Sequence, residues 1–410
     1  MRIALIAIGS TGDVQPMALL GRELMRRGHQ VRLSAFSALE PLAARAGLSF
    51  CALPVNAEAY IGSVIRPGAS PLSFLRRLTG VLRDTIEPTL DLMFEAFQGA
   101  DAVVCTFCGS TPAAMAAKAG VPLFEIRYVP LDPTGTYSMP IMRGLPFGRA
   151  CNRAVYRLGF RMIAEIERRY VHPWCSRNGI ATAGSQSAAT LFYAFSGHVV
   201  PRAPGWGEAI RQVGFFLDET ETFAPPAALR TFLDAGDAPL YIGFGSMTSG
   251  DAGNTLRAVL DALSRTKLRA VLAPGWSGMD TALFPENVYC QKEFIPHGWL
   301  FERMRAVVHH GGAGTTASSL RAGVPALIVP FGGDQFFWSE RVRALGCGPR
   351  PLPRARLTGR ALAKRLEALV ATDVYFENAA RVGAALREES GIRLAAEEIE
   401  RALGIVNGPD

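Results

Sequence analysis

Short apolar runs alternate with amphipathic segments along most of the chain. The runs at 3–8 and 31–36 have the length and composition of strands buried on both faces. Each is followed by apolar residues at three- and four-residue spacing, which is typical of a helix packed on a sheet. Repeated units of this kind predict an α/β fold with parallel sheets and helices on both faces. In the first half the predicted strands are 3–8, 31–36, 101–106 and 122–128, and the predicted helices are 16–27, 37–46, 73–97, 112–119 and 149–170.

The alternation starts again after a segment at 216–226 that is acidic and then proline-rich, which predicts a linker. We therefore expect an N-terminal domain over 1–215 and a C-terminal domain over 227–384. Residues 385–410 are expected to form a C-terminal helix that packs back on the N-terminal domain. In the second half the predicted strands are 240–244, 269–273, 306–309 and 326–330, and the predicted helices are 252–265, 314–322, 335–345, 358–371 and 375–403.

Composition excludes several classes of protein. The chain has 410 residues, of which 49% are apolar and 19% charged, and this composition is that of a globular protein. Seven cysteines are too few for a disulfide scaffold, and their odd number, without a leader pattern, predicts a reducing cytosol. No apolar run approaches the roughly 18 residues of a membrane span. The net charge of +7 is modest and no nucleic-acid-binding motif accompanies it, so we expect no nucleic-acid partner.

The first glycine-rich turn, Gly9-Ser10-Thr11-Gly12-Asp13, joins the first predicted strand to the first helix. Ligands of open parallel sheets bind at the carboxyl ends of strands, so Asp13 is a candidate for chemistry at the edge of a binding site. The spacing differs from the G-x-G-x-x-G of dinucleotide-binding turns. An ordinary turn in which Asp13 is the N-cap of the helix fits equally well.

Further turns of this kind follow predicted strands in the second half. Gly243-Phe244-Gly245-Ser246 matches the position of the first turn. His309-His310-Gly311-Gly312 comes just before the helix predicted over 314–322. Glycines expose backbone N–H groups at a helix N-terminus, where the dipole favours an anion, and His and Thr side chains add hydrogen bonds. This pattern favours a bound diphosphate over tight packing alone. Asp334 and Gln335 suit the hydroxyls of a sugar, and Asp334 can also cap its helix.

Together these motifs resemble the inverting nucleotide-sugar glycosyltransferases. The similarity is to the branch of sterol glucosyltransferases and bacterial antibiotic-aglycone glycosyltransferases, and it is thinnest over 55–80 and 130–210, where the family binds its varied acceptors. The resemblance implies the GT-B arrangement, in which two Rossmann-like domains face each other across a cleft and the C-terminal domain holds most of the donor. The motifs are GSTGDVQP (9–16), YIGFGSM (241–247), PHGWLF (296–301), HHGGAGTT (309–316) and PFGGDQFFW (330–338).

The resemblance implies a role for particular residues. Asp13 matches the catalytic base, which takes the proton of the acceptor hydroxyl as that hydroxyl attacks the anomeric carbon. Phe294 matches an aromatic residue that stacks on uracil, and Ile295 would offer backbone groups to the base. His310 matches the histidine that binds the diphosphate. The other donor-binding positions are Asp334 and Gln335 for the sugar, and Ser10, Thr11, Gly12, Ser246, Gly312, Gly314, Thr315 and Thr316.

Three departures from the family pattern bear on the chemistry. Ser318 stands where plant relatives have a glutamate that holds the ribose, and Gly298 stands where the nearest branch often has an aspartate. UDP-glucose is the favoured donor, while the choice between UDP and dTDP stays open. The fourth strand ends Cys105-Thr106-Phe107, without the acid that orients a histidine base in other relatives, which fits Asp13 acting alone. No D-x-D motif occurs, so we expect no metal and no cofactor beyond the donor.

The resulting hypothesis is a cytosolic, metal-independent, inverting glycosyltransferase. It would move a hexose to a hydroxyl of a lipophilic or polycyclic aglycone, such as a natural product, a macrolide, a glycopeptide or a sterol-like molecule. The alternatives are a nucleotide-sugar epimerase or hydrolase on the same fold, a non-catalytic sugar-nucleotide-binding helper protein, and a nicotinamide oxidoreductase. The absence of G-x-G-x-x-G counts against the last of these.

An arginine stripe lies outside these motifs. Arg149, Arg153, Arg157 and Arg161 recur at four-residue spacing, which places them on one face of the helix predicted over 149–170. A solvated helix face fits this pattern, and so does peripheral contact with an anionic membrane. The pattern does not indicate an oligomeric state.

Overall fold

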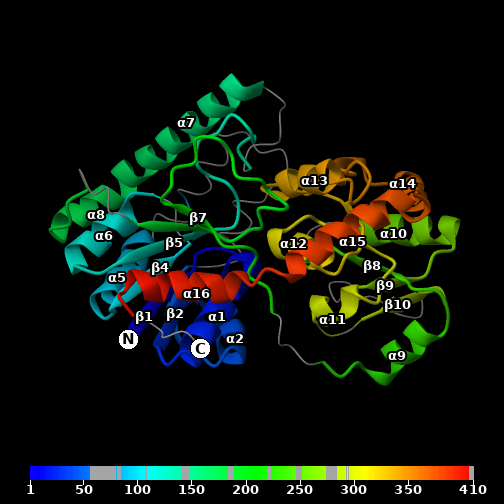
Figure 1. Cartoon of the computed structure of the whole chain (residues 1–410), viewed down its shortest axis with the longest axis horizontal. Helices are drawn as coiled ribbons and strands as arrows, with labels where there is room; N and C mark the ends of the chain where they lie inside the picture. Colours follow the sequence, from blue (N-terminus) through cyan, green and yellow to red (C-terminus); the bar gives the residue numbers. More distant parts are fainter. Residues whose placement is uncertain are drawn as a thin grey trace. The chain divides into compact units, whose positions relative to one another are not determined.

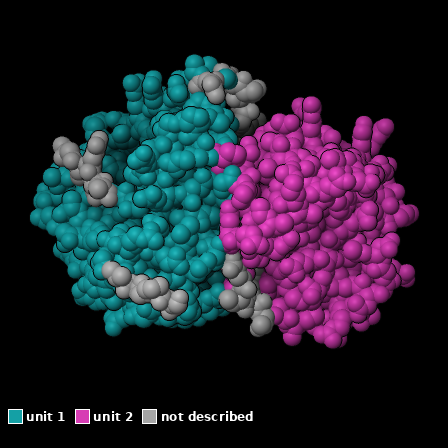
Figure 2. Space-filling model, viewed as in Figure 1, with its two compact units in different colours: residues 1–197, 202–216, 390–410 teal, residues 198–201, 217–389 magenta. Residues whose placement is uncertain are grey.

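The computed structural model describes residues 1–55, 80, 85–106, 109–140, 148–182, 189–218, 223–245, 252–273, 284–291, 293 and 295–405. The chain divides into two compact units (Figure 2). Unit 1 comprises residues 1–197, 202–216 and 390–410, and unit 2 comprises residues 198–201 and 217–389. The C-terminal segment is therefore part of unit 1.

Unit 1 contains a sheet of seven strands in the order β3-β2-β1-β4-β5-β6-β7 (Figure 1). All neighbouring strands pair in parallel. The chain runs outward from β1 to β3 and then returns to the other side of β1 to form β4, so the strand order reverses between β1 and β4. The strands are β1 (Arg2–Ile6), β2 (Gln30–Phe36), β3 (Ser49–Leu53), β4 (Ala102–Cys105), β5 (Leu123–Arg127), β6 (Thr190–Tyr193) and β7 (Ile210–Gln212).

Helices cover this sheet with apolar faces. In the first of them, Val14, Met17, Leu20 and Leu24 recur at three- and four-residue spacing and are all buried. Apart from the exposed Arg2 at the start of β1, strands β1 and β4 are apolar and buried, because both of their faces are covered. The helices of unit 1 are α1 (Thr11–Arg26), the 3₁₀-helix η1 (Ser37–Leu39), α2 (Glu40–Arg45), α5 (Ile86–Gln98), α6 (Thr111–Ala119), α7 (Gly148–Ile166), the π-helix η2 (Glu167–Val171), α8 (His172–Arg177) and α16 (Gly391–Ala402).

Unit 2 repeats this plan with five parallel strands in the order β10-β9-β8-β11-β12. Its strand order reverses between β8 and β11. The strands are β8 (Leu240–Gly243), β9 (Ala270–Leu272), β10 (Val288–Cys290), β11 (Ala306–His309) and β12 (Ala326–Ile328). The helices are α9 (Ala227–Asp234), α10 (Ala252–Thr266), α11 (His297–Phe301), α12 (Ala313–Arg321), α13 (Gln335–Ala344), the 3₁₀-helix η5 (Arg354–Arg356), α14 (Gly359–Ala371) and α15 (Asp373–Arg387).

The predicted fold class is confirmed in both units, although several elements differ from the prediction. The sequence pattern does not predict the short strands β3, β6, β7 and β10, which have three to five residues each. The first helix begins at Thr11 rather than at residue 16, because Ser10 caps it. No helix in the described part of the chain is both long and apolar enough to cross a membrane.

The helix predicted over 375–403 is two helices, α15 and α16, and it is interrupted before Gly391. A Cβ atom at Gly391 would lie 2.5 Å from the carbonyl oxygen of Phe215, so only glycine allows the two backbones to approach this closely. The chain passes from unit 2 to unit 1 at this point, five residues after the predicted boundary at 385. Apolar periodicity continues through the break, so the sequence pattern does not mark it.

A buried ion cluster fastens α16 to α1, the two helices that lie side by side in Figure 1. Glu400 is only 2% exposed. Its carboxylate accepts a hydrogen bond of 2.8 Å from Arg27 and lies 3.0 Å from Nε2 of His29. Arg27 also donates to Glu23 at 2.7 Å. The cluster ties the end of the chain to the start of unit 1.

Replacing Glu400 with Gln is expected to lower the free energy of unfolding by roughly 3 kcal/mol, because it removes the buried carboxylate that Arg27 and His29 share. Urea or thermal unfolding measures this loss. Glu398→Gln is the matched control on the same helix, since Glu398 pairs with Arg401, whose side chain is 68% exposed. The control should lose less than about 1 kcal/mol. Equal losses of stability in the two variants would show that the buried ion cluster does not contribute more than an exposed ion pair.

Candidate functional site

Each unit places two turns next to each other where its strand order reverses. Ligands of open parallel sheets bind at the carboxyl ends of strands at such points. In unit 1 the turns follow β1 and β4, and the Ile8 N–H donates a hydrogen bond of 3.2 Å to the hydroxyl oxygen of Thr106. In unit 2 the turns follow β8 and β11, and a Cβ atom at Gly245 would lie 3.5 Å from the ring of His310. We call these regions half-site 1 and half-site 2.

Half-site 1 holds Asp13 in the first turn of α1. Ser10 is the N-cap, and its hydroxyl oxygen accepts a hydrogen bond of 3.3 Å from the Gly12 N–H. Oδ2 of Asp13 accepts in return from the Ser10 N–H at 2.7 Å and from the Ser10 hydroxyl at 3.1 Å. This reciprocal arrangement is a capping box. The interpretation of Asp13 as the N-cap is therefore wrong, since Asp13 is the third residue of the helix.

The Asp13 carboxylate is suited to accept a proton. Burial raises the pKa of the carboxyl above its usual value, and the hydrogen bonds from Ser10 oppose this shift. Both hydrogen bonds from Ser10 go to Oδ2. No described residue donates a hydrogen bond to the second oxygen, Oδ1. A carboxylate with one oxygen held and one available can take the proton of a hydroxyl.

Two neighbours hold Asp13 in this position. Gly9 has a φ of +148°, and a Cβ atom there would overlap the Asp13 carboxylate. Glycine is therefore required both for the backbone conformation and for the space. On another side the Tyr128 hydroxyl donates a hydrogen bond of 3.1 Å to the backbone carbonyl of Asp13. Burial, and then the charge of Asp13, raise the pKa of Tyr128 well above its usual value, so the hydroxyl keeps its proton.

Half-site 2 is formed around the N-terminus of α12. Gly312 is the N-cap, and no side chain caps the helix. Its missing Cβ leaves room for His310, because a Cβ atom there would lie 2.6 Å from Nε2 of the imidazole. Nδ1 of His310 and the hydroxyl oxygen of Thr316 are buried without a hydrogen-bond partner among the described residues. Unsatisfied polar groups beside an uncapped helix N-terminus indicate an anion-binding site.

The histidines of half-site 2 are neutral near pH 7. Burial lowers the pKa of His310 to about 4. Burial, and then the charge of His310, lower the pKa of His297 to about 4 as well. His309 is buried, its pKa is also lowered, and its Nδ1 accepts a hydrogen bond of 3.1 Å from the Gly311 N–H. A neutral His310 can donate one N–H to an anion without carrying a charge of its own.

The predicted sugar-binding pair is arranged asymmetrically at the start of α13. Asp334 occupies the N-cap position, but its side chain makes no capping hydrogen bond, so the interpretation of Asp334 as a capping side chain is wrong. Oε1 of Gln335 accepts hydrogen bonds from the Phe331 N–H at 2.7 Å and the Gly332 N–H at 3.2 Å. The oxygen of Gln335 is therefore used to hold the preceding turn, and its amide NH₂ is the group left for a ligand.

The remaining predicted residues differ in what the structure says of them. Ile295 is buried in the core of unit 2, so its backbone rather than its side chain can reach a ligand. Gly314 is exposed and Thr315 half-buried in the first turn of α12. The exposed Thr11 and Gly12 form the first turn of α1 in unit 1. Ser246 and Phe294 lie outside the described residues.

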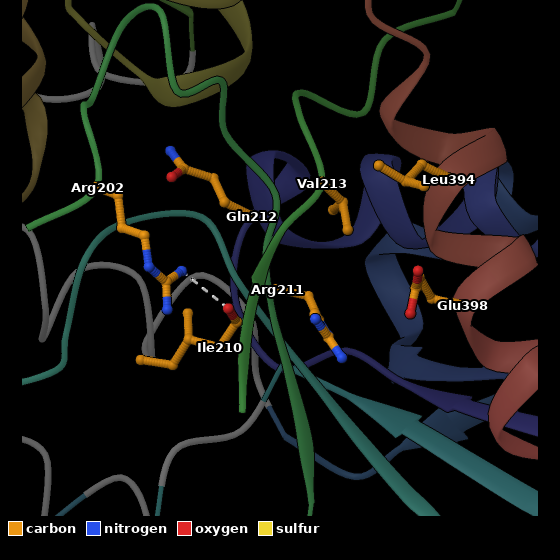
Figure 3. Close-up of a pocket in the computed structure, with 7 residues that line it drawn as sticks. All are labelled: Arg202, Ile210, Arg211, Gln212, Val213, Leu394 and Glu398. Carbon is orange, nitrogen blue, oxygen red and sulfur yellow. Dashed lines mark hydrogen bonds between the residues drawn. The ribbon is translucent and has the colours of Figure 1, made fainter. Parts of the chain in front are cut away.

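A separate cavity of about 330 Å³ lies in unit 1 beside β7 and α16 (Figure 3). Its Arg202 guanidinium donates to the carbonyl oxygen of Ile210 at 2.9 Å and to that of Gly207 at 2.7 Å. This arginine therefore holds a loop, and the cavity contains neither Asp13 nor His310. The cavity is lined by Arg202, Ile210, Arg211, Gln212, Val213, Leu394 and Glu398.

Among the described residues no three His, Cys, Asp or Glu side chains are arranged to hold a metal ion.

Two family models match most of the chain. Residues 3–126 match the glycosyltransferase family 28 N-terminal domain, and residues 257–400 match the erythromycin biosynthesis protein CIII-like C-terminal domain. The sterol 3-beta-glucosyltransferase UGT80B1 of Arabidopsis thaliana is 32% identical over 98% of this chain and 68% of its own length. The chain belongs to this glycosyltransferase family. The resemblance inferred from the motifs is thereby confirmed.

The chain spans only part of the length of several relatives. The sterol 3-beta-glucosyltransferase UGT80A2 of Arabidopsis thaliana is 33% identical over 96% of this chain and 64% of its own length. The sterol 3-beta-glucosyltransferase of Pichia angusta is 31% identical over 97% of this chain but only 33% of its own length. The chain therefore spans about one third to two thirds of the length of these two relatives.

Solved structures of glycosyltransferases share the fold. The calicheamicin glycosyltransferase CalG4 superposes with a TM-score of 0.69 and 21% identity over 100% of both chains. The kitacinnamycin glycosyltransferase superposes with a TM-score of 0.70 and 20% identity over 98% of both chains. At this level of identity the similarity concerns the fold alone, and it confirms the predicted GT-B class.

Tyr128 and His297 are two residues of the half-sites to which the sequence analysis gave no role. Tyr128 follows β5 and reaches Asp13 only through the tertiary fold. His297 begins α11, stacks on Phe301 with ring centroids 4.5 Å apart, and lies 3.5 Å from the Tyr241 hydroxyl. The PHGWLF motif at 296–301 is the available sequence signal for His297, but its partner Tyr241 lies in β8, 56 residues earlier in the chain.

The buried histidines predict that unit 2 loses stability in acid. An unfolded histidine has a pKa near 6.5, whereas His297 and His310 have pKa values of about 4 in the folded chain. Between these values the unfolded state binds more protons, so the free energy of unfolding falls as the pH falls from about 6.5 to about 4. The loss is on the order of 3 kcal/mol per histidine at the lower end.

Thermal unfolding measured across this pH range checks the prediction. His297→Gln removes one of the histidines with a lowered pKa, so the variant should lose less stability between pH 6.5 and pH 4 than the unaltered chain. A variant with an unchanged pH dependence would show that His297 does not contribute.

Proposed function

We propose that the chain is a metal-independent, inverting glycosyltransferase that transfers glucose from UDP-glucose to a hydroxyl of a lipophilic or polycyclic acceptor. The observation that carries this proposal is the opposite character of the two half-sites. Half-site 1 has a carboxylate with a raised pKa at the start of α1. Half-site 2 has an uncapped helix N-terminus beside unsatisfied His310 and Thr316. The first supplies a base, and the second suits an anionic leaving group.

Half-site 2 would bind the donor diphosphate. Backbone N–H groups in the first turn of α12 point toward an anion, and the helix dipole stabilises negative charge there. His310 and Thr316 would add hydrogen bonds from atoms that otherwise have no partner among the described residues. These donors are in place before charge develops on the leaving diphosphate, which is the condition under which they stabilise a transition state most.

Asp13 would act on the acceptor. As the acceptor oxygen attacks the anomeric carbon, the bond from that carbon to the diphosphate oxygen breaks on the opposite face, so the configuration inverts. The transition state has oxocarbenium character, as in glycoside hydrolysis. The acceptor proton passes to Oδ1 of Asp13, and the diphosphate leaves with the electron pair. A general base of this kind is typically worth roughly 10²–10⁴ in rate.

Glucose and a sterol-like acceptor are supported by the relatives that match over nearly the whole chain, which are named sterol 3-beta-glucosyltransferases. UDP is supported by the motif resemblance at 294–342. The antibiotic glycosyltransferases that share the fold support polycyclic acceptors more broadly. Ser318 and Gly298 are departures at the donor positions, so a dTDP-sugar is the competing donor to test.

A lipophilic acceptor suits a chain that meets a membrane surface, and we propose that α7 makes this contact. Arg153, Arg157 and Arg161 are exposed on one face of the helix and form no ion pair with any described residue. Leu158 on the same helix is 54% exposed. A helix with a basic face that also exposes a leucine suits an anionic bilayer. The side chain of Arg149, the fourth member of the predicted stripe, lies outside the description.

The direct experiment measures glucose transfer from UDP-glucose and UDP binding in two variants. Asp13→Asn should reduce turnover by at least about a hundredfold while UDP affinity stays nearly unchanged, because only the proton acceptor is lost. Calorimetry with UDP and a transfer assay with a sterol measure the two quantities. Loss of UDP affinity in this variant would show that Asp13 is only a structural cap.

His310→Ala is the complementary variant, and it should weaken UDP binding. Unaltered UDP affinity would place the diphosphate elsewhere. A ligand at 100 times its dissociation constant adds about 2.7 kcal/mol to stability, which a thermal-shift measurement detects. Stabilisation of the chain by dTDP and not by UDP would show that the donor is a dTDP-sugar. Turnover of UDP-glucose without an acceptor would favour the epimerase or hydrolase alternative.

The membrane proposal predicts binding to vesicles. The chain should cosediment with vesicles of phosphatidylcholine and phosphatidylserine at low salt, and the triple variant R153Q/R157Q/R161Q should bind at least tenfold less, at about 1 kcal/mol per basic residue. R45Q/R230Q/R360Q removes the same charge from exposed positions on α2, α9 and α14 and is the control. Equal loss in both variants would show that net charge, rather than α7, is responsible.

A further inference from the structure

A buried glutamate with no role in the proposed chemistry lies at the junction of α7 and α8. Glu167 is the first residue of the π-helical turn η2 and is 5% exposed. Isolated π-turns often occur near functional sites and alter the direction of a side chain. No described residue forms an ion pair with this carboxylate. A buried charge without a counterion needs another source of positive potential.

The N-terminus of α6 supplies that potential. The Glu167 carboxylate accepts hydrogen bonds from the Ser110 N–H at 2.9 Å and the Thr111 N–H at 3.1 Å. It also accepts from the hydroxyls of Ser110 at 3.0 Å and Thr111 at 2.6 Å, and its second oxygen lies 3.2 Å from the Ser110 nitrogen. Ser110 is the N-cap of α6 and makes no capping bond of its own. Glu167 therefore caps this helix from 56 residues away.

The backbone around the carboxylate is shaped to admit it. Gly109 has a φ of +143°, and a Cβ atom there would overlap Oε1 of Glu167. A side chain at this position would displace the carboxylate from the helix end. The cradle has two backbone N–H groups, two hydroxyls and a glycine, which are the components of an anion-binding helix N-terminus. Here the anion is part of the chain.

This cradle belongs to the turn that borders half-site 1. It follows β4, which pairs with β1 along its length. Beyond the last paired residues, the Thr106 N–H donates to the Ile6 carbonyl at 3.0 Å, and the Thr106 hydroxyl oxygen accepts from the Ile8 N–H at 3.2 Å. Gly109 comes three residues after Thr106, and Gly9 comes directly after Ile8. The turn that Glu167 holds and the turn that carries Asp13 therefore start at the same edge of the sheet.

We propose that Glu167 is a positioning residue for the acceptor. Its carboxylate occupies the N-terminus of α6 in place of a bound anion, and it thereby holds the turn after β4 as part of the acceptor side of half-site 1. A consequence is that, among the described residues, the helices that follow β1 and β4 both have side-chain caps, Ser10 with Asp13 at α1 and Glu167 at α6. Phosphate is then left with half-site 2. The acceptor role rests on the proposed transferase function.

The test compares Glu167→Ala and Glu167→Gln with Glu165→Ala. Glu165 lies two residues earlier, and its side chain is 59% exposed and paired with Arg168, so its loss should change nothing measurable. Glu167→Ala should lower kcat/KM for the acceptor at least tenfold and leave UDP affinity within twofold. Formate or acetate should restore activity and thermal stability saturably, because a small carboxylate can enter the vacated cradle. Glu167→Gln, which keeps one acceptor oxygen, should lie between the two.

Several results would overturn the proposal. UDP affinity that falls together with acceptor kcat/KM would show general damage instead of positioning. Stability that formate and acetate do not restore more than chloride does would show that the site does not bind an anion. If Glu167→Ala does not fold, the Glu167→Gln variant must still show the separate loss in acceptor kcat/KM. Carboxylate rescue of thermal stability does not need activity. If the unaltered chain shows no transfer while formate still stabilises Glu167→Ala, the proposed function and the acceptor role both fail, and only the role of Glu167 as a helix cap remains.

Discussion

The first N–H groups of a helix have no partner within the helix, and in this protein three helices satisfy them in three different ways. At α1 the partners are Ser10 and Asp13, which form a reciprocal pair. At α6 the partner is Glu167, which reaches the helix from a distant part of the chain. At α12 no side chain serves, because Gly312 has none to offer. A negative charge is therefore built into two helix ends of unit 1, and one helix end of unit 2 is left for an external anion.

The hydrogen bonds of Asp13 show how one carboxylate can serve both stability and the proposed chemistry. Oδ2 of Asp13 accepts both hydrogen bonds from Ser10, so the capping function uses one oxygen only. A cap of this kind contributes about 1 kcal/mol to stability. The same bonds fix the direction of the carboxylate, while burial keeps its proton affinity above the usual value. A base needs both properties, since a misdirected or fully solvated carboxylate is a weaker catalyst.

The proposed anion site of unit 2 depends on glycines, which leave out side-chain atoms, as much as on the side chains that are present. Gly312 has no side chain that would collide with His310, and Gly311 packs so closely on Ile328 that a Cβ atom there would lie 2.6 Å from its side chain. Burial then keeps His310 neutral and leaves its Nδ1 without a partner among the described residues. A consequence is sensitivity to acid. The unfolded chain binds protons at these histidines more readily than the folded chain does, so the free energy of unfolding falls as the pH falls.

The sequence by itself determined the class of fold, because strand and helix periodicity depends on neighbours within a few residues. It also identified the turns that carry Asp13, His310 and Asp334, because glycine-rich turns after apolar strands are local patterns. Only the tertiary structure decided what those side chains do with their hydrogen bonds. The oxygen of Gln335 holds its own turn, and Glu167 caps a helix 56 residues away. The break before Gly391 depends on the approach of Phe215. Such contacts join segments that are far apart in the chain, and no local pattern records which distant group will lie opposite.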